Sequence, residues 1–381
     1  MSTTRKPERG TRPANRRDLI IDAATDLFAE RGYEHVSIGA VAEAVAVGPS
    51  ALYRHFKGKE QMLTAVIETA AEAFTAAVEA APPGSAVPTA AAFSLDHRAF
   101  GVLWEREARH LPPAEYERVR ARTRAAHLTY IAAAGGVPGE SSAVAASASM
   151  SVLLSPSFHR TSLPRPEFDD HLVVLAERAL ATPLEPAPEP THTAAGLRRS
   201  STRGGLTAAA IDLFAHRTYA STTMDDVAAA VGLKASSLYN HLPGKTDLLL
   251  GALTRADGYL QLTLDRTLAE AADERAALTA LCDAYIAFAV ANPALVTLVI
   301  TEVRNLPEAS AQILQQDQRE FVGEMVHLLR LVHPGLDEAR ARVGVNAVLM
   351  TINDLARSPN AAKIVEPAAA LRVLARRILD L

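Results

Sequence analysis

Tyr53, His55 and Lys59 form a short run of hydrogen-bond donors, and the same three residue types return 186 positions later. A phenol, an imidazole and an ammonium can each donate to phosphate oxygens, and such contacts hold a protein on DNA without reading its sequence. Lys59 also opens an expected helix, where its charge opposes the helix dipole unless an anion lies nearby. Two alternatives stay open: the Tyr53 ring could pack in a small core, and His55 could merely cap a helix.

The chain repeats a whole domain. Residues 23–59 and 209–245 align without a gap, and 18 of the 37 paired positions are identical. A period this long indicates a fused or duplicated domain, because the units of solenoid proteins are far shorter. Apolar residues shared by the two copies, such as Leu52 and Leu238, fit a common three-helix core.

Each copy is expected to fold as helix, helix, tight turn and helix, the helix-turn-helix plan. In the first copy, Gly32 suits the left-handed position after the first helix, and the third helix is expected over residues 49–55. In the second copy, Thr223 suits the start of the second helix and Gly232 suits the turn. Ala46, which occupies that turn in the first copy, departs from the glycine favoured there.

The outer face of the third helix differs between the copies. Arg54 in the first copy becomes Asn240 in the second. Arginine pairs best with guanine and asparagine with adenine in the major groove, while proline and alanine offer only apolar contact to a thymine methyl. The two reading heads are therefore expected to prefer different half-sites. The other exchanges on this face are Gly48 to Lys234, Pro49 to Ala235 and Ala51 to Ser237.

Composition indicates a helical protein with two large halves. The 381 residues, 49% of them hydrophobic, leave room for two to three domains with sizeable cores. We find no apolar stretch long enough to span a membrane and no signal-peptide pattern, so a soluble, cytoplasmic protein is expected. The single cysteine, Cys282, excludes an internal disulfide framework and a cysteine-based zinc site.

Charge is concentrated at the N-terminus. The whole chain has a formal net charge of −4, yet residues 1–17 hold six Arg and Lys against one Glu, a local charge of +5. A smaller basic arm around Arg203 stands in the matching place before the second copy. A basic tail can simply be a solubilising end, but two arms at matched positions favour contact with nucleic acid.

A Pro-rich segment, residues 182–192, separates the halves because it cannot continue a helix. A shared Glu-x-Arg-x-Leu-Pro motif, at 107–112 and 302–307, indicates that both full halves descend from one ancestor. Its Glu and Arg cannot share a helix face, so we interpret the motif as a helix end, with a ligand contact as the alternative. The expected domains are a basic arm (1–17), a first helix-turn-helix domain (18–63), a first helical effector and dimerisation domain (64–181), a linker (182–197), a second arm and helix-turn-helix domain (198–249) and a second helical effector and dimerisation domain (250–381).

The segments AATDLFAERGY (residues 23–33) and SALYRHFKGKE (residues 50–60), with their counterparts in the second copy, resemble the TetR family of transcriptional regulators. The resemblance implies an all-α fold with nine helices per unit, of which the last two form a four-helix bundle with a partner. It also implies an effector pocket in the variable helical region. Residues 145–181 and 341–381 fit the dimerising helices. The tandem layout is similar to double-TetR regulators linked to actinobacterial lipid-import operons, which would make a lipid-like effector possible.

The leading hypothesis is a ligand-responsive repressor that binds an asymmetric double-stranded DNA operator as a single-chain pseudo-dimer and is released by a small hydrophobic effector. The alternatives are an architectural DNA-binding protein without an effector, or a helical enzyme, for which we find no catalytic motif. No cofactor, metal or membrane partner is expected, and a homodimer of the whole chain stays open. Expected DNA contacts are Arg16, Arg17, Ser37, Gly48, Pro49, Ser50, Ala51, Tyr53, Arg54, His55, Lys59, Arg203, Thr223, Lys234, Ala235, Ser236, Ser237, Tyr239, Asn240, His241 and Lys245. Candidate effector contacts, for which plain core packing is the alternative, are Phe100, Trp104, Tyr116, Tyr285, Phe288, Val299, Phe321 and Met325.

Overall fold

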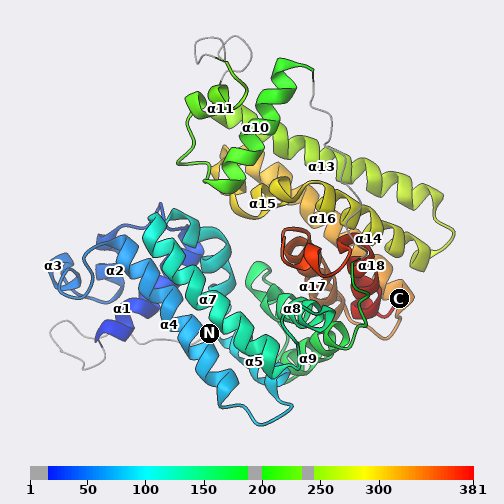
Figure 1. Ribbon diagram of the computed structural model, residues 1–381, viewed down its shortest axis with the longest axis horizontal. Helices are drawn as coiled ribbons and strands as arrows, with labels where there is room; N and C mark the ends of the chain where they lie inside the picture. The colour runs from blue at the N-terminus through cyan, green and yellow to red at the C-terminus, as the bar shows by residue number, and fades with distance from the viewer. Residues whose placement is uncertain (1–15, 188–199, 234–243) are drawn as a thin grey trace. The chain divides into compact units, whose positions relative to one another are not determined.

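A computed structural model describes residues 16–187, 200–233 and 244–381, and within these ranges the chain is built from helices (Figure 1). The described residues hold no β structure except one isolated bridge between Pro186 and Val365. The predicted all-α fold is confirmed. Apolar residues recur at helical spacing in nearly every segment, so each helix has a face to bury.

The two halves run through their helices in the same order (Figure 1). The first half has α1 (Arg16–Arg31), α2 (Ile38–Ala44), α3 (Pro49–Leu52), α4 (Lys59–Glu79), α5 (Ala86–Asp96), α6 (Ala99–Val102), α7 (Pro113–Ala133), α8 (Ser141–Leu154) and α9 (Glu167–Leu180). The second half has α10 (Thr202–His216), α11 (Met224–Ala230), α13 (Lys245–Glu270), α14 (Glu274–Ala291), α15 (Pro293–Thr301), α16 (Glu308–Val332), α17 (Glu338–Ala356) and α18 (Pro367–Leu379). Shorter turns are η1 (Leu103–Glu107, π-helical) and, of the 3-10 type, η2 (Ala108–His110), η3 (Ser155–Phe158), η4 (Val303–Asn305) and η5 (Ala361–Lys363).

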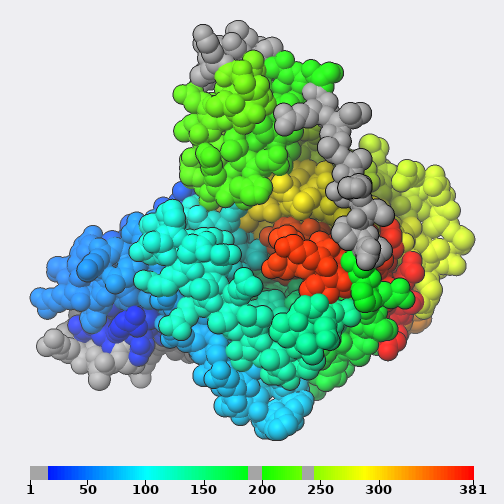
Figure 2. Space-filling model, in the orientation of Figure 1, coloured from blue at the N-terminus to red at the C-terminus, as the bar shows by residue number. Residues whose placement is uncertain are grey.

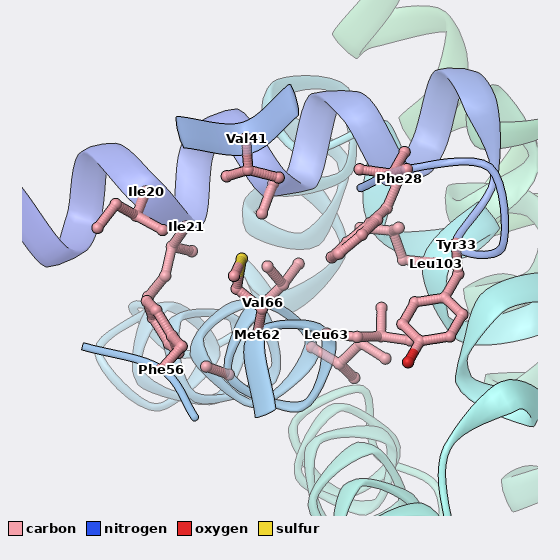
Figure 3. Close-up of a cluster of buried hydrophobic side chains, with 14 of the residues drawn as sticks. Ile20, Ile21, Phe28, Tyr33, Val41, Phe56, Met62, Leu63, Val66 and Leu103 are labelled. Atoms are coloured by element: carbon pink, nitrogen blue, oxygen red, sulfur yellow. The ribbon is translucent and has the colours of Figure 1, made fainter. Parts of the chain in front are cut away.

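The chain divides into two compact units after Ala133. In the first unit, α1, α2 and α4 converge on one core, and Figure 3 shows Phe28, Val41 and Leu63 from these three helices pointing toward one another. Leu103 from η1 completes the same core and is only 1% exposed. The helix-turn-helix is therefore packed directly on the helical region that follows it, with α4 common to both.

The second unit holds the second helix-turn-helix. Here α10 packs on α13 and α15 as well as on α11. Figure 2 shows the segment of α10 and α11, in green, lying over the yellow and gold helices. Leu206, Ala210 and Phe214 of α10 are at most 1% exposed, so this helix buries one continuous stripe.

The same unit contains a bundle formed by α8 and α9 of the first half with α17 and α18 of the second (Figure 1). The ring of His171 in α9 hydrogen-bonds the carbonyl oxygen of Arg340 at 3.1 Å. Arg178, also in α9, donates to the carbonyl oxygen of Ile378 at 3.1 Å. These contacts join the last two helices of one half to the last two of the other, in the segments where dimerising helices were expected.

Among the described residues no single helix is long and apolar enough to cross a membrane. Only when α14 and α15 are taken together, as a pair bent by 100°, do described helices reach the length and apolar composition of a membrane span.

Candidate DNA-binding heads and effector cavity

In the first copy, capping and turn residues set the geometry of the helix-turn-helix. The hydroxyl of Ser37 accepts the N–H of Ala40 at 3.1 Å and so starts α2. After α2 the chain reverses at Ala46, which has a left-handed backbone with φ 55°. Leu52 is fully buried and fixes α3 on the core. Ser37, expected as a DNA contact, therefore also has a local role as a helix cap.

The third helix is shorter than the expected span of 49–55. Its α-helical part ends at Leu52, because the next residues tighten into turns in which the N–H of His55 donates to the carbonyl of Leu52 at 2.9 Å. Phe56 follows and is buried with 2% exposure. Leu52 and Phe56 thus hold both ends of the short segment that lies between them.

The residues next to the buried Leu52 and Phe56 face outward. Tyr53 is 56% exposed, which is incompatible with packing of its ring in the core. Arg54 and His55 are exposed beside it. At the start of α3, Gly48, Pro49 and Ser50 are exposed as well, and Ala51 is half-buried. The first copy therefore presents one continuous outer face that carries a phenol, a guanidinium and an imidazole, and this face could donate to phosphates and base edges.

Lys59 has partners that the sequence did not indicate. Its ammonium donates to the backbone carbonyl of Tyr33 at 2.6 Å and to that of Glu34 at 3.4 Å. The ammonium also lies 4.1 Å from the centre of the Tyr33 ring. Burial lowers the pKa of Lys59. These contacts account for a cation at the start of α4 by tying it to the loop between α1 and α2. Contact with phosphate stays a prediction.

Glu107, from the Glu-x-Arg-x-Leu-Pro motif, lies on the other side of the same tyrosine. Its carboxylate is 2% exposed and accepts the backbone N–H of Tyr33 at 2.8 Å. The motif does fall at a helix end, since η1 closes at Glu107 and α7 begins at Pro113. Tyr33 is therefore held at its N–H by η1 and at its carbonyl by α4. We call this arrangement the tyrosine clamp.

The second copy builds the same clamp independently. The ammonium of Lys245 donates to the carbonyl of Tyr219 at 2.6 Å and lies 4.1 Å from the centre of its ring. The N–H of Tyr219 donates to the carboxylate of Glu302 at 3.4 Å, and Glu302 is only 3% exposed. The Tyr219 hydroxyl shares a hydrogen bond of 2.9 Å with Thr246. The Glu, Tyr and Lys of the clamp thus recur in both copies with the same contacts.

Thr223 starts α11 through a capping box with Asp226. Its hydroxyl accepts the N–H of Asp226 at 3.1 Å, and the Asp226 carboxylate accepts the N–H of Thr223 at 2.8 Å. The predicted helix start is confirmed. Gly232, predicted in the turn, follows α11 with a left-handed backbone of φ 74°, and the predicted left-handed Gly32 is confirmed with φ 84°. The expected contacts Lys234, Ala235, Ser236, Ser237, Tyr239, Asn240 and His241 lie outside the described residues.

Only the inner ends of the two arms are described. Arg17 is exposed near the start of α1, and its guanidinium lies 5.4 Å from the centre of the Phe56 ring. Arg16 is half-buried at the first position of α1. Arg203 is exposed in the first turn of α10. All three lie at the start of the first helix of their head, and their contact with DNA stays a prediction.

The second half encloses a cavity of about 760 Å³, a volume that includes its mouth. Four of the five effector contacts expected in this half line it, namely Tyr285, Phe288, Val299 and Phe321. The fifth, Met325, is fully buried and is not a lining residue. The Tyr285 hydroxyl donates to Asn353 of α17 at 2.9 Å. The cavity wall is thereby linked to the bundle.

The three aromatic residues expected as effector contacts in the first half pack against the core of the first DNA-binding domain. Phe100, Trp104 and Tyr116 are partly buried on this core. The rings of Trp104 and Tyr116 are stacked, with centroids 6.2 Å apart and planes inclined by 4°. This placement fits the alternative of plain core packing, and a role for them in effector binding stays a prediction.

A family model described as bacterial regulatory proteins of the tetR family matches residues 20–66 and again residues 206–252. The chain carries two TetR-family DNA-binding domains in tandem. The two matches cover α1 to the first turns of α4 and α10 to the first turns of α13, and so contain both lysines of the tyrosine clamps.

Curated relatives resemble a limited part of the chain. The HTH-type transcriptional regulator TcmR of Streptomyces glaucescens is 44% identical over 68 residues, 18% of this chain and 30% of that protein. The HTH-type transcriptional repressor KstR2 of Mycolicibacterium smegmatis is 36% identical over 61 residues, 16% of this chain and 30% of that protein. A solved TetR-family regulator from Bordetella parapertussis 12822 matches with 21% identity and a TM-score of 0.45, over 48% of this chain and 96% of its own.

The tyrosine clamp was not predicted from the sequence, although its residues left a signal there. The repeated Glu of the Glu-x-Arg-x-Leu-Pro motif and the repeated Tyr33 and Lys59 were each visible as residues shared by both halves. What joins them is tertiary contact over 26 and 74 positions of the chain. Spacing alone cannot reveal such a contact, since no local periodicity links the three residues.

Proposed function

We propose that this chain is a ligand-responsive DNA-binding transcriptional regulator, a repressor that one small hydrophobic effector releases from its operator. The observation that carries the proposal is the presence of two TetR-family domains in one chain, the first of which presents Tyr53, Arg54 and His55 on an exposed face. A short exposed helix that is followed directly by donors of this kind suits entry into the major groove. The arms and the remaining expected contacts would then follow the phosphates on either side.

We further propose that one chain acts as a pseudo-dimer on an asymmetric operator. The packing of α8 and α9 against α17 and α18 supports this, because it joins the two halves through the helices by which TetR-like units are expected to pair. The second support is the difference between the heads, since Arg54 and Asn240 favour different bases. A homodimer of the whole chain would instead present four heads.

An effector bound in the cavity would release the DNA because the cavity lies beside the second clamp. Val299 and Val303 line the cavity, and Glu302, which holds the N–H of Tyr219, lies between them in the chain. A ligand that displaces this segment would therefore move the carboxylate that positions the loop of the second head. A ligand shifts the heads only if it binds one arrangement more tightly than the other.

The experiment that tests the proposal is selection of a DNA site from random sequence, followed by titration of that site in the presence of small-molecule extracts. We expect tight, salt-dependent binding to an asymmetric site and a loss of affinity with at least one extract. Binding that no extract alters would favour an architectural DNA-binding protein without an effector. Mass spectrometry of whatever copurifies with the protein would then identify the bound molecule.

A further inference from the structure

The lining of the second-half cavity includes two carboxyl groups that come from different helices. Asp257 of α13 and Asp317 of α16 both line the cavity, and they lie close enough for Asp317 to raise the pKa of Asp257. Gln261, which also lines the cavity, donates to the backbone carbonyl of Asp317 at 3.0 Å and so links α13 to α16.

The lining of this cavity offers the pair no positive charge. Apart from Asp257 and Asp317, the lining residues are aliphatic, aromatic or glutamine, with no Lys, Arg or His among them. Burial, and next the neighbouring Asp317, raise the pKa of Asp257 from 3.8 to about 6. Burial and a second carboxyl group at close range both disfavour the charged form of Asp257, and a bound cation would relieve both effects.

The rest of the wall suits an apolar body with a positive head. The Tyr285 ring lies 6.2 Å from that of Phe288 and 6.1 Å from that of Phe321, measured between centroids, so three aromatic rings meet at the cavity. The faces of aromatic rings attract cations, and such rings commonly surround organic ammonium groups. Acidic and aromatic groups are thus brought to one site.

The first half lacks this pair. Counted from the start of α4 and α13, the counterpart of Asp257 is Ala71, which is 1% exposed. Counted from the proline of the shared motif, the counterpart of Asp317 is Arg122, which lies 3.7 Å from Glu72. An alanine and an arginine would not attract a cation. The acidic pair is therefore a property of the second half and not of the repeated scaffold.

We propose that the second-half cavity binds a cationic amphiphile, with an amine or ammonium head at Asp257 and Asp317 and an apolar body against Tyr285, Phe288 and Phe321. The inference rests on the proposed function in taking this cavity as the effector site. It adds the chemical class of the effector, a positively charged hydrophobic molecule, and assigns the response to one half of the chain.

Three probes with the same alkyl chain and different heads test the proposal on the full-length protein: decylamine, decan-1-ol and decanoate, measured by isothermal titration calorimetry. We expect decylamine to bind at least tenfold more tightly than decan-1-ol and decanoate to bind weakest. The Asp257→Asn/Asp317→Asn double variant keeps both side-chain shapes and should lose the preference for the amine while it retains decan-1-ol. Asp265→Asn, an exposed acid on the same helix, serves as the control and should keep the preference.

Equal binding of decylamine and decan-1-ol would overturn the inference and leave a hydrophobic effector site in place. Absence of binding by all three probes would overturn it too, as would an equal loss of amine preference in the Asp265→Asn control, which would indicate attraction to the acidic surface. Failure of the proposed function has a different signature: decylamine would bind the cavity with the expected preference and leave the affinity for DNA unchanged.

Discussion

At the scale of single residues, the two copies share two left-handed backbone positions but fill them with different residue types. After the first helix, Gly32 (φ 84°) corresponds to Thr218 (φ 116°). In the turn of the helix-turn-helix, Ala46 (φ 55°) corresponds to Gly232 (φ 74°). Each copy thus holds one glycine and one residue with a side chain where the backbone favours glycine. Thr218 is compensated, because its hydroxyl accepts the N–H of Ser221 at 3.2 Å.

Ala46 has no such compensation, so Ala46→Gly is expected to stabilise the first head. Relief of the left-handed strain outweighs the entropy that glycine adds to the unfolded chain, for a net gain of about 0.5 to 1 kcal/mol in the free energy of unfolding. Urea denaturation measures it. The matched control is Gly232→Ala, where a new Cβ would meet nothing within 4 Å, so only backbone strain acts and stability should fall. A loss of stability in the Ala46→Gly variant would contradict the presence of backbone strain at Ala46.

Arg54 is expected to govern base choice in one half of the operator only. Arg54→Ala removes the exposed guanidinium of the first head and should relax the preference at one position, at a cost of about 1 to 3 kcal/mol there. Selection from randomised duplexes measures the change at every position. Relaxation of the same base in both half-sites would show that the heads are not assigned one to each half-site.

Lys59 is expected to matter in two measurable ways. Lys59→Gln removes the donor to the Tyr33 and Glu34 carbonyls, so the free energy of unfolding should fall by about 1 to 3 kcal/mol. If the ammonium also contacts a phosphate, the slope of log affinity against log salt should fall by about one unit, equally for all DNA sequences. Lys245→Gln is the counterpart in the second head. If both variants lose stability and keep the salt slope unchanged, the two lysines act only within the clamps and do not contact phosphate.

At the scale of helices, much of the DNA-binding head was predictable because its signals are local. The caps, the left-handed glycines and the buried Leu52 followed from short patterns that the chain states twice. Placement that depends on distant contacts was not predictable. Met325 has the same apolar character as Phe321 and lies one turn further along the same face of α16, yet it is outside the cavity lining, so the outcome depends on where along the helix the cavity ends. The acidic pair of the cavity also required the juxtaposition of α13 and α16, which lie 60 positions apart at Asp257 and Asp317.

The clamp makes one short segment, from α15 into η4, important for the second head. Glu302→Ala would leave the N–H of Tyr219 and the amide of Asn305 without their carboxylate acceptor, so we expect a loss of about 1 to 3 kcal/mol in stability. Hydrogen exchange should quicken at Tyr219 while the core of α13 stays protected. Glu270→Ala, an exposed acid at the end of α13, is the control and should change stability by less than about 0.5 kcal/mol. An unchanged rate of amide hydrogen exchange at Tyr219 in this variant would contradict the role of Glu302 in the clamp.

At the scale of the whole molecule, the bundle of α8, α9, α17 and α18 and the unlike third helices lead to one expectation: a single chain occupies one non-palindromic operator. Two recognition helices about 34 to 36 Å apart would enter successive major grooves on one face of the duplex. Light scattering of the protein on a short operator duplex should give the mass of one 40.5 kDa chain plus DNA. A palindrome built from two copies of either half-site should bind more weakly, because one head would then meet the wrong bases at about 1 to 3 kcal/mol for each mismatched pair. Two chains on the minimal duplex, or tighter binding to a palindrome, would instead mean that whole chains pair and that like heads read like half-sites.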